Sequence, residues 1–94
     1  MGIFVVTLAT RAERDLKRVP KHIAEKFQTW LDLVENEGLR ESRKIRSFHD
    51  EPLKGNRKGE RSIRLSRAYR AIYIEINNGK MEFIEVQEVN RHDY

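Results

Sequence analysis

The chain contains no cysteine, and that absence removes several kinds of chemistry at once. Disulfide bonds, thiol nucleophiles and zinc sites built on cysteine are all excluded. No apolar run is long enough to cross a membrane, and the opening residues lack the basic start and the cleavage region of a signal peptide. We therefore expect a cytoplasmic protein with no membrane association.

The length of 94 residues suits one domain with a modest core, and we expect a single domain over residues 1–94. Hydrophobic residues make up 38% of the chain, which is enough for a globular fold. Neither length nor composition indicates two lobes that close over a cleft. Any active site is therefore expected on an open surface.

Positive charge is concentrated in the middle of the chain. Residues 40–70 contain eleven basic and four acidic side chains, whereas residues 71–94 contain two basic and five acidic ones. Such a cluster repels itself and suits a polyanionic partner such as nucleic acid. A solvated basic face on an ordinary domain is the alternative interpretation.

The first half of the chain predicts a strand followed by two helices. The apolar run over 3–8 predicts the strand, and Thr10 with Glu13 predicts a capping box for a helix over about 11–18. Pro20 is placed to open a second helix. Its buried stripe at helical spacing is formed by Ile23, Phe27, Trp30, Leu31 and Val34, and Gly38 is its C-cap.

The second half predicts a meander of three strands. Residues 45–48 are interpreted as strand-like, and the following glycines and Pro52 mark turns. Strands are predicted over 61–66 and 69–76, and the NNG sequence at 77–79 predicts a hairpin to a last strand that starts at Met81. The predicted fold is therefore α+β, in the order strand, helix, helix, three-stranded antiparallel meander.

This hairpin determines how four regularly spaced arginines are placed. In a strand, Arg64 projects from the face opposite Ile63 and Leu65, and Arg70 on the partner strand lies within cross-strand reach of it. Arg67 falls at the turn and Arg61 at the entry of the strand. Two or more of these cations are expected to converge.

Beyond the last strand lie His92 and Tyr94, which together with Arg64 and Arg70 make a candidate site. Cleavage of RNA at a 2′-hydroxyl needs a base, an acid and cations that stabilise the phosphorane, and no metal or other cofactor. The sequence His49–Asp50–Glu51 imitates a metal-ligand cluster, but consecutive residues of a strand point in opposite directions. We therefore expect no metal site.

The motif "EPLKGNRKGERSIRLSRAYRAIY", followed by a strand and a terminal "NRHDY", resembles the RelE/ParE superfamily of type II toxins, near its HigB and YoeB branches. The resemblance covers nearly the whole chain and implies a ribosome-dependent mRNA endonuclease that leaves a cyclic phosphate. It implies that Arg70 stabilises the scissile phosphate, with Arg64 beside it, and that Glu51 is a candidate general base. It also implies roles for His92 and Tyr94.

One departure from the YoeB pattern is Asp93, which separates His92 from Tyr94. HigB-like members use an aspartate close to this pair, so Asp93 is a further candidate. The sequence leaves open whether Glu51 or His92 is the base. A turn role for Glu51 is the structural alternative.

The remaining basic side chains fit sequence-independent contacts with ribosomal RNA. They are Lys54, Arg57, Lys58, Arg61, Arg67 and Arg91. The resemblance further implies a cognate antitoxin that covers the basic site, and operator DNA bound only through that antitoxin. Two other functions stay open: a ParE-like inhibitor of DNA gyrase, which the terminal "RHDY" disfavours, and a basic RNA-binding module without catalysis.

Overall fold

The computed structural model describes residues 4–77 and 82–91. Its elements follow one another as β1 (Phe4–Leu8), α1 (Thr10–Arg18), α2 (Lys21–Glu37), α3 (Leu39–Ser42), η1 (Arg46–Phe48), β2 (Glu51–Pro52), η2 (Gly55–Arg57), β3 (Glu60–Arg64), β4 (Tyr69–Asn77) and β5 (Glu82–Arg91). The two η segments are single turns of 3-10 helix. The predicted strand–helix–helix–meander order is confirmed.

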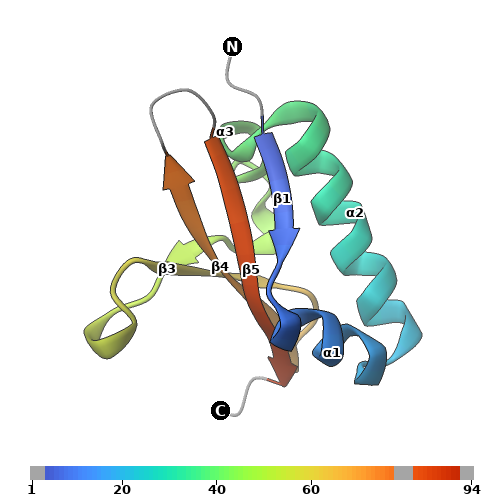
Figure 1. Cartoon of the computed structure of the whole chain (residues 1–94). Coiled ribbons are helices and arrows are strands. Elements are labelled where there is room, and N and C mark those ends of the chain that lie inside the picture. The colour runs from blue at the N-terminus through green and yellow to red at the C-terminus, as the bar shows by residue number, and fades with distance from the viewer. Residues whose placement is uncertain (1–3, 78–81, 92–94) are drawn as a thin grey trace.

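The strands form one five-stranded sheet in the order β1-β5-β4-β3-β2 (Figure 1). Strands β3, β4 and β5 are antiparallel neighbours, as the meander prediction required. Strand β1 pairs in parallel with β5, and the two-residue β2 adds an antiparallel edge to β3. The sheet is therefore mixed, and it joins the first strand of the chain to the last.

Helices α1 and α2 cover one face of this sheet (Figure 1). The stripe predicted for α2 forms the core: Ile23, Trp30 and Val34 are fully buried, and Phe27 is nearly so. The ring of Trp30 packs against Tyr73 of β4, with 5.3 Å between the ring centroids. The prediction that Trp30 anchors the core is therefore confirmed.

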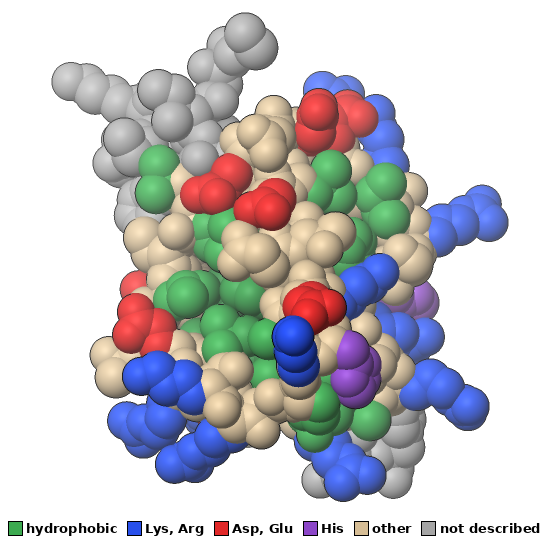
Figure 2. All heavy atoms as spheres, turned by 90° about the vertical axis from the view of Figure 1, so that its right-hand side faces the viewer, with side chains coloured by type: hydrophobic (Ala, Val, Ile, Leu, Met, Phe, Trp, Pro, Cys, Tyr) green, Lys and Arg blue, Asp and Glu red, His purple; other side chains and the backbone are tan. Residues whose placement is uncertain are grey.

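The outer face on the side of α2 carries charge of both signs (Figure 2). Apolar side chains are visible at its centre, and lysine and arginine side chains gather toward its margins. Leu31 and Leu33 of α2 are only partly buried against the core. The helical face therefore lacks the dense positive charge that residues 40–70 carry. The candidate site is expected on another face of the molecule.

The predicted capping box at the start of α1 is wrong. Thr10 is already inside the helix, Ala9 is its N-cap, and no side chain caps the helix. The cause lies in the sheet, because the backbone N–H of Ala9 donates to the carbonyl of Val86 at 2.9 Å. This bond extends the β1 pairing by one residue, so the helix begins directly after it. Pro20 likewise is the N-cap of α2 rather than its first residue.

The interpretation of residues 45–48 as strand-like is also wrong. Gly38, with a φ of 87°, ends α2 as predicted, but the short helix α3 follows at once and η1 occupies Arg46–Phe48. Phe48 is buried and anchors this coil, and Lys26 lies 4.7 Å above its ring. A single buried aromatic in a polar segment carries no periodicity, which is why the sequence pattern failed here.

Two details of the meander position the site. Strand β3 ends at Arg64 rather than at residue 66, and the turn starts with Leu65, whose N–H donates to the carbonyl of Tyr69 at 2.9 Å. In β5, Gln87 is an extra residue between the partners of Ile72 and Tyr73. The hairpin predicted at 77–79 lies outside the described residues except for Asn77, which pairs with Glu82.

No helix within the described part of the chain is long and apolar enough to span a membrane.

Candidate functional site

The end of the β3–β4 hairpin holds two arginines side by side. Arg64 and Arg70 are directly opposite each other in the register, on the face away from the buried Ile63 and Ala71. Like charges in such a pair repel each other. Among residues 4–77 and 82–91, no carboxylate lies within 4.0 Å of either guanidinium, and the buried Nε of Arg70 has no hydrogen-bond partner there. The pair is therefore suited to an external anion.

The turn that follows holds a third arginine. The Oγ of Ser66 accepts hydrogen bonds from the backbone N–H groups of Ala68 and Tyr69, at 3.1 and 3.2 Å. These bonds order the turn around the exposed Arg67. Arg67, Arg64 and Arg70 line one small open pocket of about 50 Å³. The strand register places Arg64 opposite Arg70, and the turn adds Arg67, so these three arginines converge as the sequence predicted.

Glu51 also lines this pocket. It pairs with Ser62 in β2–β3, which puts its side chain on the same face as Arg64. Its side chain is 55% exposed, and its Oε2 lies 3.2 Å from the Nε2 of His49. The pocket thus combines a solvated carboxylate with three cations, which is the kind of set that can transfer a proton beside a bound phosphate.

His49 is a site residue that the sequence prediction missed. It is the only residue other than glycine with a positive φ in the described chain, with φ 45° and ψ 51°. Backbone strain of this kind costs about 1–3 kcal/mol and gathers at functional sites. The bend turns Asp50 inward and leaves His49 and Glu51 outside, so the three consecutive residues do not converge on one point. The described residues include no group of three His, Cys, Asp or Glu side chains that could hold a metal ion.

Asp50 was missed as well, and it anchors this segment. Its side chain is fully buried, and its two oxygens accept hydrogen bonds from Arg61 Nε at 2.7 Å and from the Tyr73 hydroxyl at 2.6 Å. Burial, and then the bond to Asp50, raise the pKa of Tyr73 well above its usual 10.0. One carboxylate therefore ties the two-residue β2 to β3 and β4. Only the register reveals this contact, so no local sequence signal could have found it.

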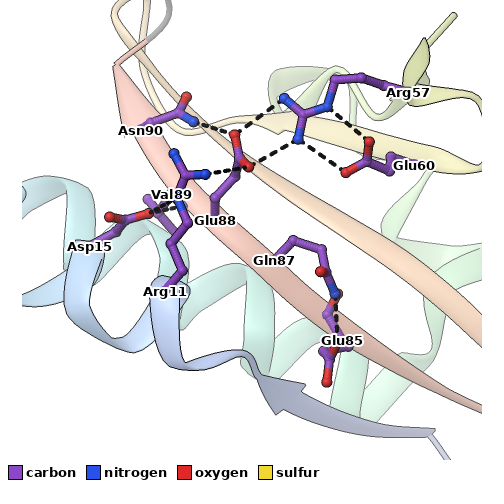
Figure 3. Close-up of polar contacts among 9 residues, drawn as sticks. All are labelled: Arg11, Asp15, Arg57, Glu60, Glu85, Gln87, Glu88, Val89 and Asn90. Atoms are coloured by element: carbon purple, nitrogen blue, oxygen red, sulfur yellow. Dashed lines mark hydrogen bonds and ion pairs between the residues drawn. The ribbon is translucent and has the colours of Figure 1, made fainter. Parts of the chain in front are cut away.

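A second ion-pair network surrounds Arg57 (Figure 3). By the strand register, its carboxylates Glu60 and Glu88 lie on the face of the sheet away from Asp50, which is the face of Arg64 and Arg70. Arg57 Nε donates to Glu60 at 2.8 Å, and its Nη2 donates to Glu88 at 3.0 Å. The bonds to Glu60 and then to Glu88 raise the pKa of Arg57. Arg11 of α1 lies 3.5 Å from the same Glu88 carboxylate, and Asp15 accepts the backbone N–H of Val89 at 3.0 Å.

The structure thus places the predicted RNA-contact residues in two different environments. Arg57 and Arg61 are bound to internal carboxylates, whereas Lys54, Lys58 and Arg67 are exposed. Arg91 is exposed too and lies opposite Tyr69, at the same end of the sheet as Arg70. RNA contact stays a prediction for all six. The other predicted residues, His92, Asp93 and Tyr94, lie outside the described residues.

Neither the protein-family models nor the curated proteins contain a match to this chain. Solved structures do match it. YafQ from E. coli strain BL21(DE3) aligns with a TM-score of 0.73 and 17% identity, over 94% of this chain and 92% of its own. The YoeB–YefM complex from Staphylococcus aureus gives 0.70 and 22%, over 96% and 98%. The toxin–antitoxin complex RelBE2 from Mycobacterium tuberculosis gives 0.58 and 22%, over 94% and 96%.

These structures share nearly the whole length of the chain but less than a quarter of its residues, so what they share with it is the fold. The chain has the fold of the RelE/ParE toxins, as its sequence motif implied. YoeB, one of the two branches that the motif resembled, is among the structures that match.

Proposed function

We propose that this chain is the toxin of a type II toxin–antitoxin system and that it cuts mRNA on the ribosome. The observation that carries the proposal is the Arg64–Arg70 pair, which shares a pocket with Glu51 and has no carboxylate partner among the described residues. Two adjacent, uncompensated guanidinium groups fit the charge that develops on a phosphorane. The shared fold with YafQ and RelBE2, which occur in toxin–antitoxin complexes, supports the toxin role.

In the proposed reaction, a base takes the proton from a ribose 2′-hydroxyl and the 2′-oxygen attacks the adjacent phosphorus. The bond from phosphorus to the 5′-oxygen breaks, and an acid protonates that oxygen. The products are a 2′,3′-cyclic phosphate and a 5′-hydroxyl, and no metal or cofactor takes part. Arg70 and Arg64 hold the phosphate oxygens, Glu51 or His92 is the base, and Tyr94 is a further candidate for substrate contact.

The proposal includes partners of two kinds. Lys54, Lys58, Arg67 and Arg91 would contact ribosomal RNA, which places the protein in the cytoplasm. A cognate antitoxin would cover the arginine pocket with carboxylates of its own, in line with the complexes in which YoeB and RelBE2 occur. Operator DNA would be bound through that antitoxin.

The test is primer extension on a reporter mRNA after brief induction of the toxin. Wild type is compared with Arg70→Ala and with Arg40→Ala, a control that removes an exposed arginine of α3 outside the pocket. Wild type and Arg40→Ala are expected to give discrete cuts that require translation, and Arg70→Ala is expected to cut about 10²–10³ times more slowly.

Two results would contradict the proposal. Growth arrest with intact mRNA and broken DNA would indicate a gyrase inhibitor. Ribosome binding that falls together with the growth effect in Arg70→Ala, with no cleavage product in wild type, would indicate a basic binding module.

A further inference from the structure

A second, larger hollow lies directly beside the arginine pocket. Its volume is about 320 Å³, and it is lined by Arg43, Ile45, Arg46, His49, Asp50 and Glu51. His49 and Glu51 line both hollows, so this pair forms a ridge between them. A linear ligand that enters the first pocket would cross this ridge into the second hollow.

The second hollow displays an apolar side chain that the fold does not use. Ile45 is 41% exposed and is the only large hydrophobic side chain that stays exposed among residues 5–76 and 84–91. It stands next to Arg46, which is exposed and has no carboxylate within 4.0 Å among residues 4–77 and 82–91. An apolar surface beside a free cation suits a ligand that has a flat apolar face and a negative charge.

Ion pairs with neighbouring strands hold the walls of this hollow in place. Arg43 Nη2 donates to Glu75 of β4 at 3.0 Å, and its Nε lies 4.0 Å from the buried Asp50 carboxylate. Asp50 lines the hollow, but its carboxylate is fully buried and bound to Arg61 and Tyr73, so its charge is compensated. The remaining carboxylate is that of Glu51, which His49 contacts. The hollow is therefore preformed, and a ligand does not have to order it.

Resting on the proposed function, we infer that this hollow binds the nucleotide next to the scissile phosphate. Its base would pack on Ile45 and its phosphate would contact Arg46. Proteins that recognise single-stranded RNA hold unstacked bases on aromatic side chains or arginine planes and track the backbone with positive charge. Ile45 offers an apolar surface in place of an aromatic ring. Continuity with the arginine pocket across the His49–Glu51 ridge favours RNA over any other ligand. Base preference at one position beside the cut then arises from Ile45.

The experiment maps RNA 5′ ends across the transcriptome after brief induction. It compares wild type with Ile45→Ala, Ile45→Trp and Arg46→Ala, and with the matched control Arg40→Ala. We expect Ile45→Ala to reduce the base preference at one position next to the cut, and Ile45→Trp to strengthen it by up to about tenfold because a base stacks well on an aromatic ring. Arg46→Ala should reduce cutting at all sites alike, and Arg40→Ala should change neither property.

Three outcomes would overturn the inference. If wild type cuts and both Ile45 variants keep its rate and its base preference, the subsite is wrong while the proposed function stands. If the Ile45 variants cut as wild type does but escape neutralisation by the antitoxin, the hollow binds that protein instead. If wild type makes no cuts, the proposed function fails and the subsite with it. Because Ile45 is exposed, thermal unfolding of the variants should match wild type, which excludes misfolding as the cause.

Discussion

Two arginines of the same five-residue strand have opposite surroundings. Arg61 lies on the helix side of the sheet, where Asp50 accepts its Nε–H at 2.7 Å. Arg64, three residues on, faces the other side and stands against Arg70, with no carboxylate near it in the described residues. The first is part of the core boundary, and the second is available to a ligand. From the sequence alone, Arg61 and Arg64 are indistinguishable members of one basic cluster.

The comparison shows that the number of cations overstates the charge presented to a partner. Arg43, Arg57 and Arg61 all belong to the basic middle of the chain, and each one is paired with a carboxylate: the exposed Glu75, the largely buried Glu88 and the buried Asp50, respectively. The pairs of Arg57 and Arg61 hold the short η2 and β2 segments onto the sheet. The cations that converge on one pocket form a smaller group at the hairpin end: Arg64, Arg67 and Arg70.

The largest predicted effect comes from removing Asp50, the carboxylate that binds Arg61. Asp50→Ala leaves the half-buried Arg61 without its acceptor and the buried Tyr73 without the partner of its hydroxyl. We expect the free energy of unfolding to fall by about 3–5 kcal/mol, measured by urea denaturation. Asp32→Ala, at an exposed position of α2, is the control and should change it by less than about 0.5 kcal/mol. A loss under about 1 kcal/mol for Asp50→Ala would show that the anchor is unimportant.

A smaller effect follows from removing one hydroxyl of the same network. Tyr73→Phe leaves the ring packed against Trp30 and takes away only the donor to Asp50. Because the acceptor is a buried charge, we expect a loss of about 1–3 kcal/mol in unfolding free energy. Phe27→Leu offers a comparison in which the core is altered but no hydrogen bond is lost. If Tyr73→Phe were neutral, the bond to Asp50 would have no net value.

The Arg57 network predicts a dependence on acid. Burial alone would raise the pKa of Glu88, but the bonds and charge of Arg57 outweigh it, so the pKa lies below the usual 4.5. The network therefore stabilises the fold above pH 4.5 and loses that contribution as the pH falls through the lowered pKa. Glu88→Gln should cost about 1–2 kcal/mol at pH 7. Between pH 7 and pH 3, the unfolding free energy of Glu88→Gln should fall less steeply than that of wild type, as measured by denaturation at each pH. An equally steep fall in both proteins would contradict this assignment.

The smallest effect on stability is expected at Arg64. Arg64→Ala removes no internal ion pair, so the unfolding free energy should change by less than about 0.5 kcal/mol. Binding to single-stranded RNA should instead lose about 0.7 from the slope of log affinity against log salt for the one phosphate contact removed. Fluorescence anisotropy at several salt concentrations measures that slope. If Arg64→Ala destabilises the fold as strongly as Arg61→Ala does, the contrast between the two arginines is wrong.

The sequence predicted what depends on strong periodicity and missed what depends on register. The α2 stripe through Trp30 and the meander followed from apolar spacing, and the pairing of Arg64 with Arg70 followed from the hairpin. The contacts of Asp50 with Tyr73, 23 residues away, carry no local pattern. The same holds for α3 and η1, which are short and are held by one or two buried residues each. The sequence motifs therefore identified the cations of the candidate site. They did not identify Asp50 and Glu88, the carboxylates that pair with Arg61 and Arg57.

The parallel pairing of β1 with β5 has a consequence for the order of folding. Residues 4–8 form their ladder with residues 82–86, and Asp15 receives the N–H of Val89 from 74 positions further along the chain. A sheet closed by contacts this distant in sequence forms slowly and late, because the ends of a long loop must first meet. On a translating ribosome, β1 has no partner until the last strand has emerged. A nascent copy therefore lacks a complete sheet until β5 has emerged, and the arginine pair acquires its final setting only after that.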